Sequence, residues 1–215
     1  MGWLTRLLSS SIGKKTLVAA AGLLLCGFLI THLAGNLLLV AGENSFNRYA
    51  EALESNPLII PAELVLALLF LGHIVMSLRV KYENRKARPA AYVMSVAKGG
   101  RTPGSRTMIY SGLILLAFVI IHIKTFKFGD KSFGLYRLVI DSFQNNLYTA
   151  FYVLAMALLG FHLSHGFWSA FQTLGVSHPK YTPLIKRTGL VFAVVIAGGF
   201  AFLPLWARFS GSSMP

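Results

Sequence analysis

The chain has 215 residues, of which 55% are hydrophobic and 13% charged, and its formal net charge is +13. The core of a soluble domain of this length cannot hide so many apolar side chains, which excludes a soluble globular protein. We therefore predict an all-α integral membrane protein in which residues 1–215 form a single domain.

Five stretches are apolar over the length that a membrane-spanning helix needs, which is about 20 residues. In chain order they are residues 16–40, 58–78, 107–123, 147–171 and 189–206. The first stretch is too long for a signal peptide and no A-x-A cleavage site follows it, so we expect it to remain as a helix. After it, residues 44–54 are expected to form a short amphipathic surface helix that is capped by Asn44 and ends before Pro57.

The charged residues divide unevenly between the two sides that five spans define. Segments 1–15, 79–106 and 172–188 share one side and hold 14 Lys and Arg against a single acid, Glu83, whereas six basic and six acidic residues share the other side. The positive-inside rule then places the N-terminus in the cytoplasm and the C-terminus outside. The basic excess is thus a topology signal and a landing surface for anionic lipid or an acidic partner, and it does not indicate nucleic acid binding.

The single cysteine, Cys26, lies inside the first span. One cysteine excludes a disulfide framework, an iron–sulfur cluster and covalent heme attachment through C-x-x-C-H. Any heme in this chain is therefore held by coordination alone.

Five histidines lie within the first four spans, where a titratable ring is costly and indicates a functional site, and four of them, one from each span, fall into two layers of depth. These four are His32, His73, His122 and His162. At 1.5 Å per residue, His32 lies about 26 Å from Lys15 and His122 about 24 Å from Arg106, so both belong to an outer layer. His73 lies about 9 Å from Arg79, and His162 about 15 Å from the inner end of its span, so both belong to an inner layer.

Each layer takes one histidine from each of two helices, as a heme clamped between facing helices of a bundle requires. We therefore predict two non-covalent b hemes in a bundle of the first four spans. Small residues would leave room for a flat macrocycle, although they also pack membrane helices without a cofactor; they are Gly35, Gly72, Gly160 and Gly166. His165, three residues after His162, cannot ligate the same face of one iron, and is expected to hydrogen-bond a propionate or a quinone, or to pack.

Three runs resemble the cytochrome b subunit of succinate:quinone oxidoreductases. They are THLAGNLLL (residues 31–39), FNRYAEALESNPLIIPAELVLALLFLGHI (46–74) and FHLSHGFWSAFQTLG (161–175). The resemblance is to the five-helix, two-heme class that anchors succinate dehydrogenase or fumarate reductase in the bacterial cytoplasmic membrane. It implies that His73 and His162 hold the proximal heme near the cytoplasm and that His32 and His122 hold the distal heme. It also favours His162 over His165 as the ligand.

The resemblance further implies a flavoprotein and an iron–sulfur protein on the cytoplasmic face, with electrons passing to menaquinone. The chain itself has no nucleotide-binding fingerprint and no cysteine cluster, so we expect it to perform no dicarboxylate chemistry. Its expected role is to anchor the complex, to carry electrons and to supply part of a quinone site. The loop 82–106, which is rich in glycine and proline, is the expected docking surface for the iron–sulfur protein.

Quinone chemistry moves protons, so a quinone site needs a titratable group. The resemblance favours acidic residues near the distal heme, with Glu54 as first candidate and Glu63 as second. Glu54, like Glu43 and Glu51, could instead solvate an outer loop, and Glu63 could instead favour a helix N-terminus through the helix dipole. Arg79 would pair with a heme propionate or extend to the lipid headgroups.

Two other functions stay open. One is a diheme cytochrome b that serves a hydrogenase or a nitrate reductase. The other is a proton-coupled transporter with histidine relays, which predicts no heme absorption and a path of polar residues; these spans contain few polar residues.

Overall fold

A computed structural model of the chain describes residues 2, 5, 9–87 and 103–211, and every regular element in these residues is helical. The elements are α2 (Ser11–Leu37), the 3-10 helix η1 (Leu38–Ala41), α3 (Glu43–Glu54), α4 (Ile59–Lys86), α5 (Pro103–Phe126), α6 (Leu135–Ser142), α7 (Asn146–Thr173) and α8 (Thr182–Gly211).

Five of these helices, α2, α4, α5, α7 and α8, are long and apolar enough to cross a membrane, which confirms the predicted fold class and number of spans. Each helix is longer than the apolar run that predicted it: α4 continues past Leu78 to Lys86, and α8 begins at Thr182 rather than at Gly189. An apolar stretch ends at the first charged residues, whereas the backbone hydrogen bonds of a helix continue through its polar ends outside the hydrocarbon.

Local caps explain where several helices begin. The side chain of Ser10 accepts a hydrogen bond from the Gly13 backbone N–H, and Asn145 does the same for the first turn of α7. The predicted helix at residues 44–54 exists, but the prediction that Asn44 caps it is wrong. α3 starts one residue earlier because Gly42, at φ +97°, makes the sharp turn after η1, and no side chain caps the helix.

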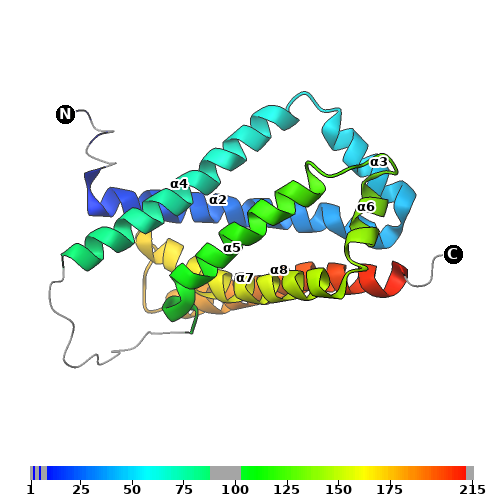
Figure 1. Cartoon of the computed structure of the whole chain (residues 1–215). Helices are drawn as coiled ribbons and strands as arrows, with labels where there is room; N and C mark the ends of the chain where they lie inside the picture. The colour runs from blue at the N-terminus through cyan, green and yellow to red at the C-terminus, as the bar shows by residue number, and fades with distance from the viewer. Residues whose placement is uncertain (1, 3–4, 6–8, 88–102, 212–215) are drawn as a thin grey trace.

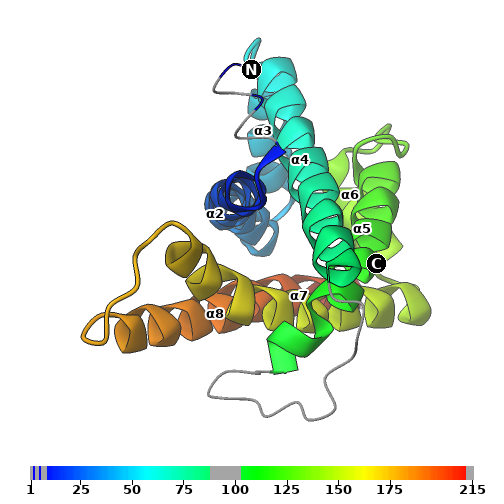
Figure 2. The same cartoon turned by 90° about the vertical axis from the view of Figure 1, so that its left-hand side faces the viewer.

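Each long helix packs against one or more of the others (Figures 1 and 2). α7 and α8 run side by side, α5 and α2 pack against α7, and α4 packs against α2. The buried core draws on α2, α7, α8 and the short helices, with Leu33, Leu39, Tyr136, Tyr152, Ile196 and Ala207 among its members. By contrast, none of the residues from Ile59 to Lys86 of α4 is buried.

The two ends of the bundle differ. We call the end where α2, α5 and α8 begin the basic end; there the buried Lys14 of α2 forms an ion pair with Glu83 of α4. We call the other the capped end, because η1, α3 and α6 fold together over it (Figure 1). α6 was not predicted. It is short, and it buries Tyr136, Val139 and Ile140 against this end.

Contacts between α3 and α6 hold the cap in place. The side-chain oxygen of Asn47 accepts a hydrogen bond from the Tyr136 backbone N–H at 2.9 Å. The Phe46 and Tyr136 rings meet edge to face, with centroids 6.5 Å apart, and both side chains are buried. The cap is therefore an ordered layer and not a loose loop.

Candidate functional site

Four of the intramembrane histidines, one on each of α2, α4, α5 and α7, meet in two pairs. The rings of His32 on α2 and His122 on α5 have centroids 5.8 Å apart and planes at 89°. The rings of His73 on α4 and His162 on α7 have centroids 6.4 Å apart and planes at 67°. These are the two pairs that depth counting predicts. We call them the capped-end pair (His32, His122) and the basic-end pair (His73, His162).

The two pairs lie at different levels along the bundle. On α7, Tyr152 contacts the ring of His122 and stands ten residues before His162, which corresponds to a rise of about 15 Å. On α2, the Val18 carbonyl contacts His73 and stands fourteen residues before His32, a rise of about 21 Å. The pairs are therefore separated by roughly half the thickness of a membrane or somewhat more.

In the basic-end pair, each Nδ1 atom faces an oxygen. Nδ1 of His73 lies 3.1 Å from the Val18 carbonyl oxygen, which can only accept a hydrogen bond. Nδ1 of His162 lies 3.2 Å from the Ser111 hydroxyl, which itself donates to the Met108 carbonyl at 3.1 Å and so accepts from the ring. These contacts favour a proton on Nδ1 of both rings, which would leave the lone pair of each Nε2 atom for a metal.

The capped-end pair sits among aromatic side chains. Each ring stacks on a phenylalanine four residues earlier in its own helix: Phe28 on His32 at 5.1 Å and Phe118 on His122 at 5.7 Å between centroids. Nδ1 of His122 lies 3.3 Å from the hydroxyl of the buried Tyr152. This stacking and this hydrogen bond limit how far the His122 ring can turn.

His32 differs from the other three histidines in its partner. Its Nδ1 lies 3.3 Å from the side-chain nitrogen of Asn36, which also donates to the His32 carbonyl at 2.8 Å. Since an amide nitrogen only donates, this contact favours a proton on Nε2 of His32. Ligation through Nε2 would give up this one long hydrogen bond, at a cost of about 1 kcal/mol.

The spacing of the rings in each pair is compatible with a metal whose other ligands do not come from the protein. A ring nitrogen lies about 2 Å from a metal it ligates and about 1 Å from the ring centre, so two imidazoles on one metal have centroids about 6 Å apart. Among the described residues there is no group of three or more His, Cys, Asp or Glu that could hold a bare ion. Two histidines without further protein ligands would be a suitable donor set for a heme, whose porphyrin would supply the remaining ligands.

Glycines open the space beside the basic-end pair, but they are not the glycines that were expected. A Cβ on Gly22 would lie 3.2 Å from Cε1 of His73, and one on Gly112 would lie 3.6 Å from Cε1 of His162. Gly35 and Gly160 instead face Tyr49 and Ala197, so they serve helix packing. The sequence did contain a signal for Gly22 and Gly112. Each precedes the histidine of its own helix by ten residues: Gly22 precedes His32, and Gly112 precedes His122.

The two auxiliary candidates do not belong to the ring pairs. His165 meets the edge of Trp168, with centroids 5.2 Å apart, and its buried Nδ1 has no hydrogen-bond partner in the described part of the chain. His162, and not His165, is thus the residue of α7 whose ring meets His73. Arg79 is exposed on α4.

The acidic candidates for a quinone site form ion pairs at the capped end. Glu54 pairs with Lys131 at 2.5 Å, and Glu63 pairs with Lys127. Both lysines belong to the connection between α5 and α6, so the two pairs tie α3 and α4 to that connection. Each carboxylate thus has a structural role whether or not it also moves protons.

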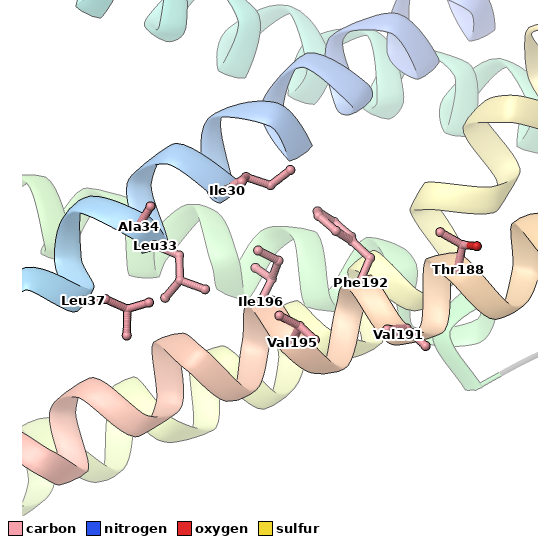
Figure 3. Close-up of a pocket in the computed structure, with 9 residues that line it drawn as sticks. All are labelled: Ile30, Leu33, Ala34, Leu37, Thr188, Val191, Phe192, Val195 and Ile196. Carbon is pink, nitrogen blue, oxygen red and sulfur yellow. The ribbon is translucent and has the colours of Figure 1, made fainter.

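An apolar groove runs between α2 and α8 and holds about 380 Å³ (Figure 3). Its lining consists of Ile30, Leu33, Ala34, Leu37, Thr188, Val191, Phe192, Val195 and Ile196. With Thr188 as the one hydroxyl in this lining, the groove suits an acyl or prenyl chain and lacks the donors that would orient a quinone ring. Residues 88–102, most of the loop predicted to dock an iron–sulfur protein, lie outside the described residues.

Fold and site together define a multi-pass α-helical membrane protein with two facing histidine pairs inside its helix bundle. No protein-family model, curated protein or solved structure matches the chain.

Proposed function

We propose that this chain is the diheme cytochrome b anchor of a succinate:quinone oxidoreductase, which passes electrons between an iron–sulfur protein and membrane menaquinone. The observation that carries the proposal is the meeting of four intramembrane histidines in two pairs, with ring centroids 5.8 and 6.4 Å apart and no third metal-binding side chain beside them in the described residues. The resemblance of the sequence to this class supports the particular complex.

In this proposal, His73 and His162 hold one b heme, and His32 and His122 hold the other. A bound heme supplies reversible one-electron transfer at its iron. The protein orients the imidazoles of His73, His122 and His162 through their Nδ1 contacts with oxygen atoms, which is the usual way in which surrounding groups set a metal-binding histidine. Aromatic side chains surround the capped-end pair.

The proposed orientation follows from charge. The basic end faces the cytoplasm of a bacterium, where the flavoprotein and the iron–sulfur protein would dock, and the capped end faces outward. The two proposed hemes would lie at levels about 15 Å apart along α7, so electron transfer between them would cross half of the hydrocarbon core. Menaquinone would react near the capped end, where Glu54 and Glu63 are the candidate proton-handling groups.

Heme content tests the proposal most directly. A pyridine hemochrome assay on the purified chain is expected to give two b hemes per chain, and less than one would refute the two-site arrangement. His73→Ala and His162→Ala should each remove the same heme, whereas His32→Ala and His122→Ala should remove the other. His178→Ala, in the exposed connection before α8, is the matched control and should leave both hemes in place.

The partner is tested separately. Copurification of an iron–sulfur protein and a flavoprotein with succinate dehydrogenase activity supports the proposed complex. A chain that binds two hemes but copurifies with a hydrogenase or nitrate reductase would instead be the electron carrier of that enzyme. A chain without heme absorption would point to the transporter alternative.

A further inference from the structure

Among the described residues, the buried hydroxyl of Tyr152 is the one hydrogen-bond partner of the His122 ring, and the contacts around this hydroxyl determine which way its proton points. Tyr152 is 5% exposed. Its ring is enclosed by Phe118 and Phe143, whose centroids lie 4.9 and 5.0 Å away in edge-to-face contacts. Phe126 and Phe151 complete the enclosure at 6.2 and 5.9 Å. This packing restricts the movement of the Tyr152 ring, so its hydroxyl stays beside the partners that it has.

A chain of hydroxyl groups fixes the direction of each hydrogen bond. Tyr148 donates its single proton to Oγ1 of Thr125 at 3.0 Å. The Tyr148 hydroxyl lies 2.9 Å from that of Tyr152, and with its own proton already committed it can only accept from Tyr152. Tyr152 therefore donates its hydroxyl proton to Tyr148, and its oxygen can only accept a hydrogen bond from His122.

The consequence falls on the His122 ring. Because Tyr152 can only accept at Nδ1, 3.3 Å away, the ring proton must be on Nδ1. The Nε2 atom is then left with its lone pair. The path Thr125–Tyr148–Tyr152 thus prepares His122 as a metal ligand, from groups on α5 and α7 that touch no metal themselves.

We propose that Tyr152 is a positioning residue for His122: it holds the ring in the tautomer that ligates iron, and it strengthens the imidazole as an electron donor. This inference rests on the proposed function, since it assigns Tyr152 a role toward a heme of the capped-end pair. A histidine whose Nδ1–H is bonded to an oxygen is a more basic ligand, and a more basic ligand favours the oxidised, more positive iron. Tyr152 therefore lowers the reduction potential of the capped-end heme.

The basic-end pair contains a matched counterpart. The Ser111 hydroxyl faces Nδ1 of His162 at 3.2 Å and donates its own proton to the Met108 carbonyl, so it also accepts from the ring. Removal of one hydroxyl, by Tyr152→Phe or by Ser111→Ala, then addresses one pair at a time. Both substitutions keep the remaining side chain in place, so the packing around each ring changes little.

The experiment is a redox titration of the purified two-heme protein, followed in the α-band and by the low-spin EPR signals. Tyr152→Phe is expected to raise the potential of one heme and to move its EPR signal, while the second heme is unchanged. Ser111→Ala is expected to raise the potential of the other heme. The His73→Ala protein, which keeps only the capped-end heme, identifies which component belongs to which pair.

Several outcomes overturn the inference. Unchanged potentials and EPR signals in Tyr152→Phe would do so, and so would a shift of the same component in Tyr152→Phe and Ser111→Ala.

If Tyr152→Phe binds a single heme, the variant Tyr148→Phe tests the inference instead. That variant keeps the Tyr152 hydroxyl but removes the acceptor that polarises it, so a smaller shift of the capped-end heme in the same direction supports the inference and no shift overturns it. A wild-type chain without heme would instead defeat the proposed function, which the hemochrome assay shows first.

Discussion

The ion pair between Lys14 and Glu83 should respond unequally to the loss of its two partners. The Lys14 side chain is 6% exposed, whereas that of Glu83 is 42% exposed. The ammonium group lies 2.5 Å from both carboxylate oxygens. Glu83→Gln therefore leaves a buried charge without a counter-charge, while Lys14→Met leaves a carboxylate that water can reach.

The expected magnitudes follow from these exposures. Breaking a fully buried pair costs about 3–5 kcal/mol, and losing an exposed pair costs about 0–1 kcal/mol. With one partner half exposed, Glu83→Gln should lower the free energy of unfolding by about 2 kcal/mol. Lys14→Met should cost less than about 1 kcal/mol, because the methionine keeps the apolar stem of the lysine packed.

Thermal unfolding in detergent, followed by the loss of helical circular dichroism, measures the difference. For a chain of this size, about 2 kcal/mol corresponds to a fall in Tm of about 4–8 °C. Lys15→Met, at the exposed neighbouring position, is the control for the charge change and should lie within about 0.5 kcal/mol of the wild type. The double variant Lys14→Met/Glu83→Gln should be more stable than Glu83→Gln alone. Equal losses in Glu83→Gln and Lys14→Met would show that burial of the ammonium does not control the energetics.

Three further predictions concern the backbone and the cap. Gly22→Ala places a Cβ 3.2 Å from Cε1 of His73, so the ring must move by a few tenths of an ångström, and the absorbance of the heme proposed for the basic-end pair should fall. Gly27→Ala, with open space around its Cβ, should leave that absorbance unchanged. Asn47→Ala removes the acceptor of the Tyr136 N–H and should cost about 1–2 kcal/mol in thermal unfolding, and an equal loss in the exposed Asn44→Ala would contradict this role. Gly42→Ala forces a side chain onto φ +97° and ψ 172°, so it should cost about 1–3 kcal/mol, and a wild-type Tm would refute the need for glycine there.

The features that could be predicted from the sequence are those that depend on distance along a helix. Spans follow from the length of apolar runs, and the pairing of His32 with His122 and of His73 with His162 follows from rise per residue. The rotation of each helix about its axis could not be predicted, because spans that are apolar on all sides show no face that must point inward. For that reason the contacts of Tyr152 with His122, and of Ser111 with His162, appear only in the structure.

Partners far apart in the sequence were likewise out of reach. Lys14 and Glu83 are 69 positions apart. The sequence places both on the basic side of the membrane but does not predict that they pair. Glu54 and Glu63 were read as candidate proton carriers, and their pairing with Lys131 and Lys127 depends on how the α5–α6 connection folds back over the capped end. The Asn36–His32 contact, in contrast, joins positions four apart on one helix, so the sequence did contain a signal for it.

Helix α4 has none of its residues buried, yet three polar contacts attach it to the rest of the molecule: Glu63 to Lys127, His73 to Val18, and Glu83 to Lys14. These attachment points are ten residues apart, and ten residues advance a helix by about 15 Å and turn it by about 280°, so the three points lie on different sides of the axis. Three contacts on different sides of a helix constrain both its tilt and its rotation about its axis. Loss of the contact at Glu63 or at Glu83 would remove one of these three constraints, and α4 would then be held by the other two and by its packing against α2.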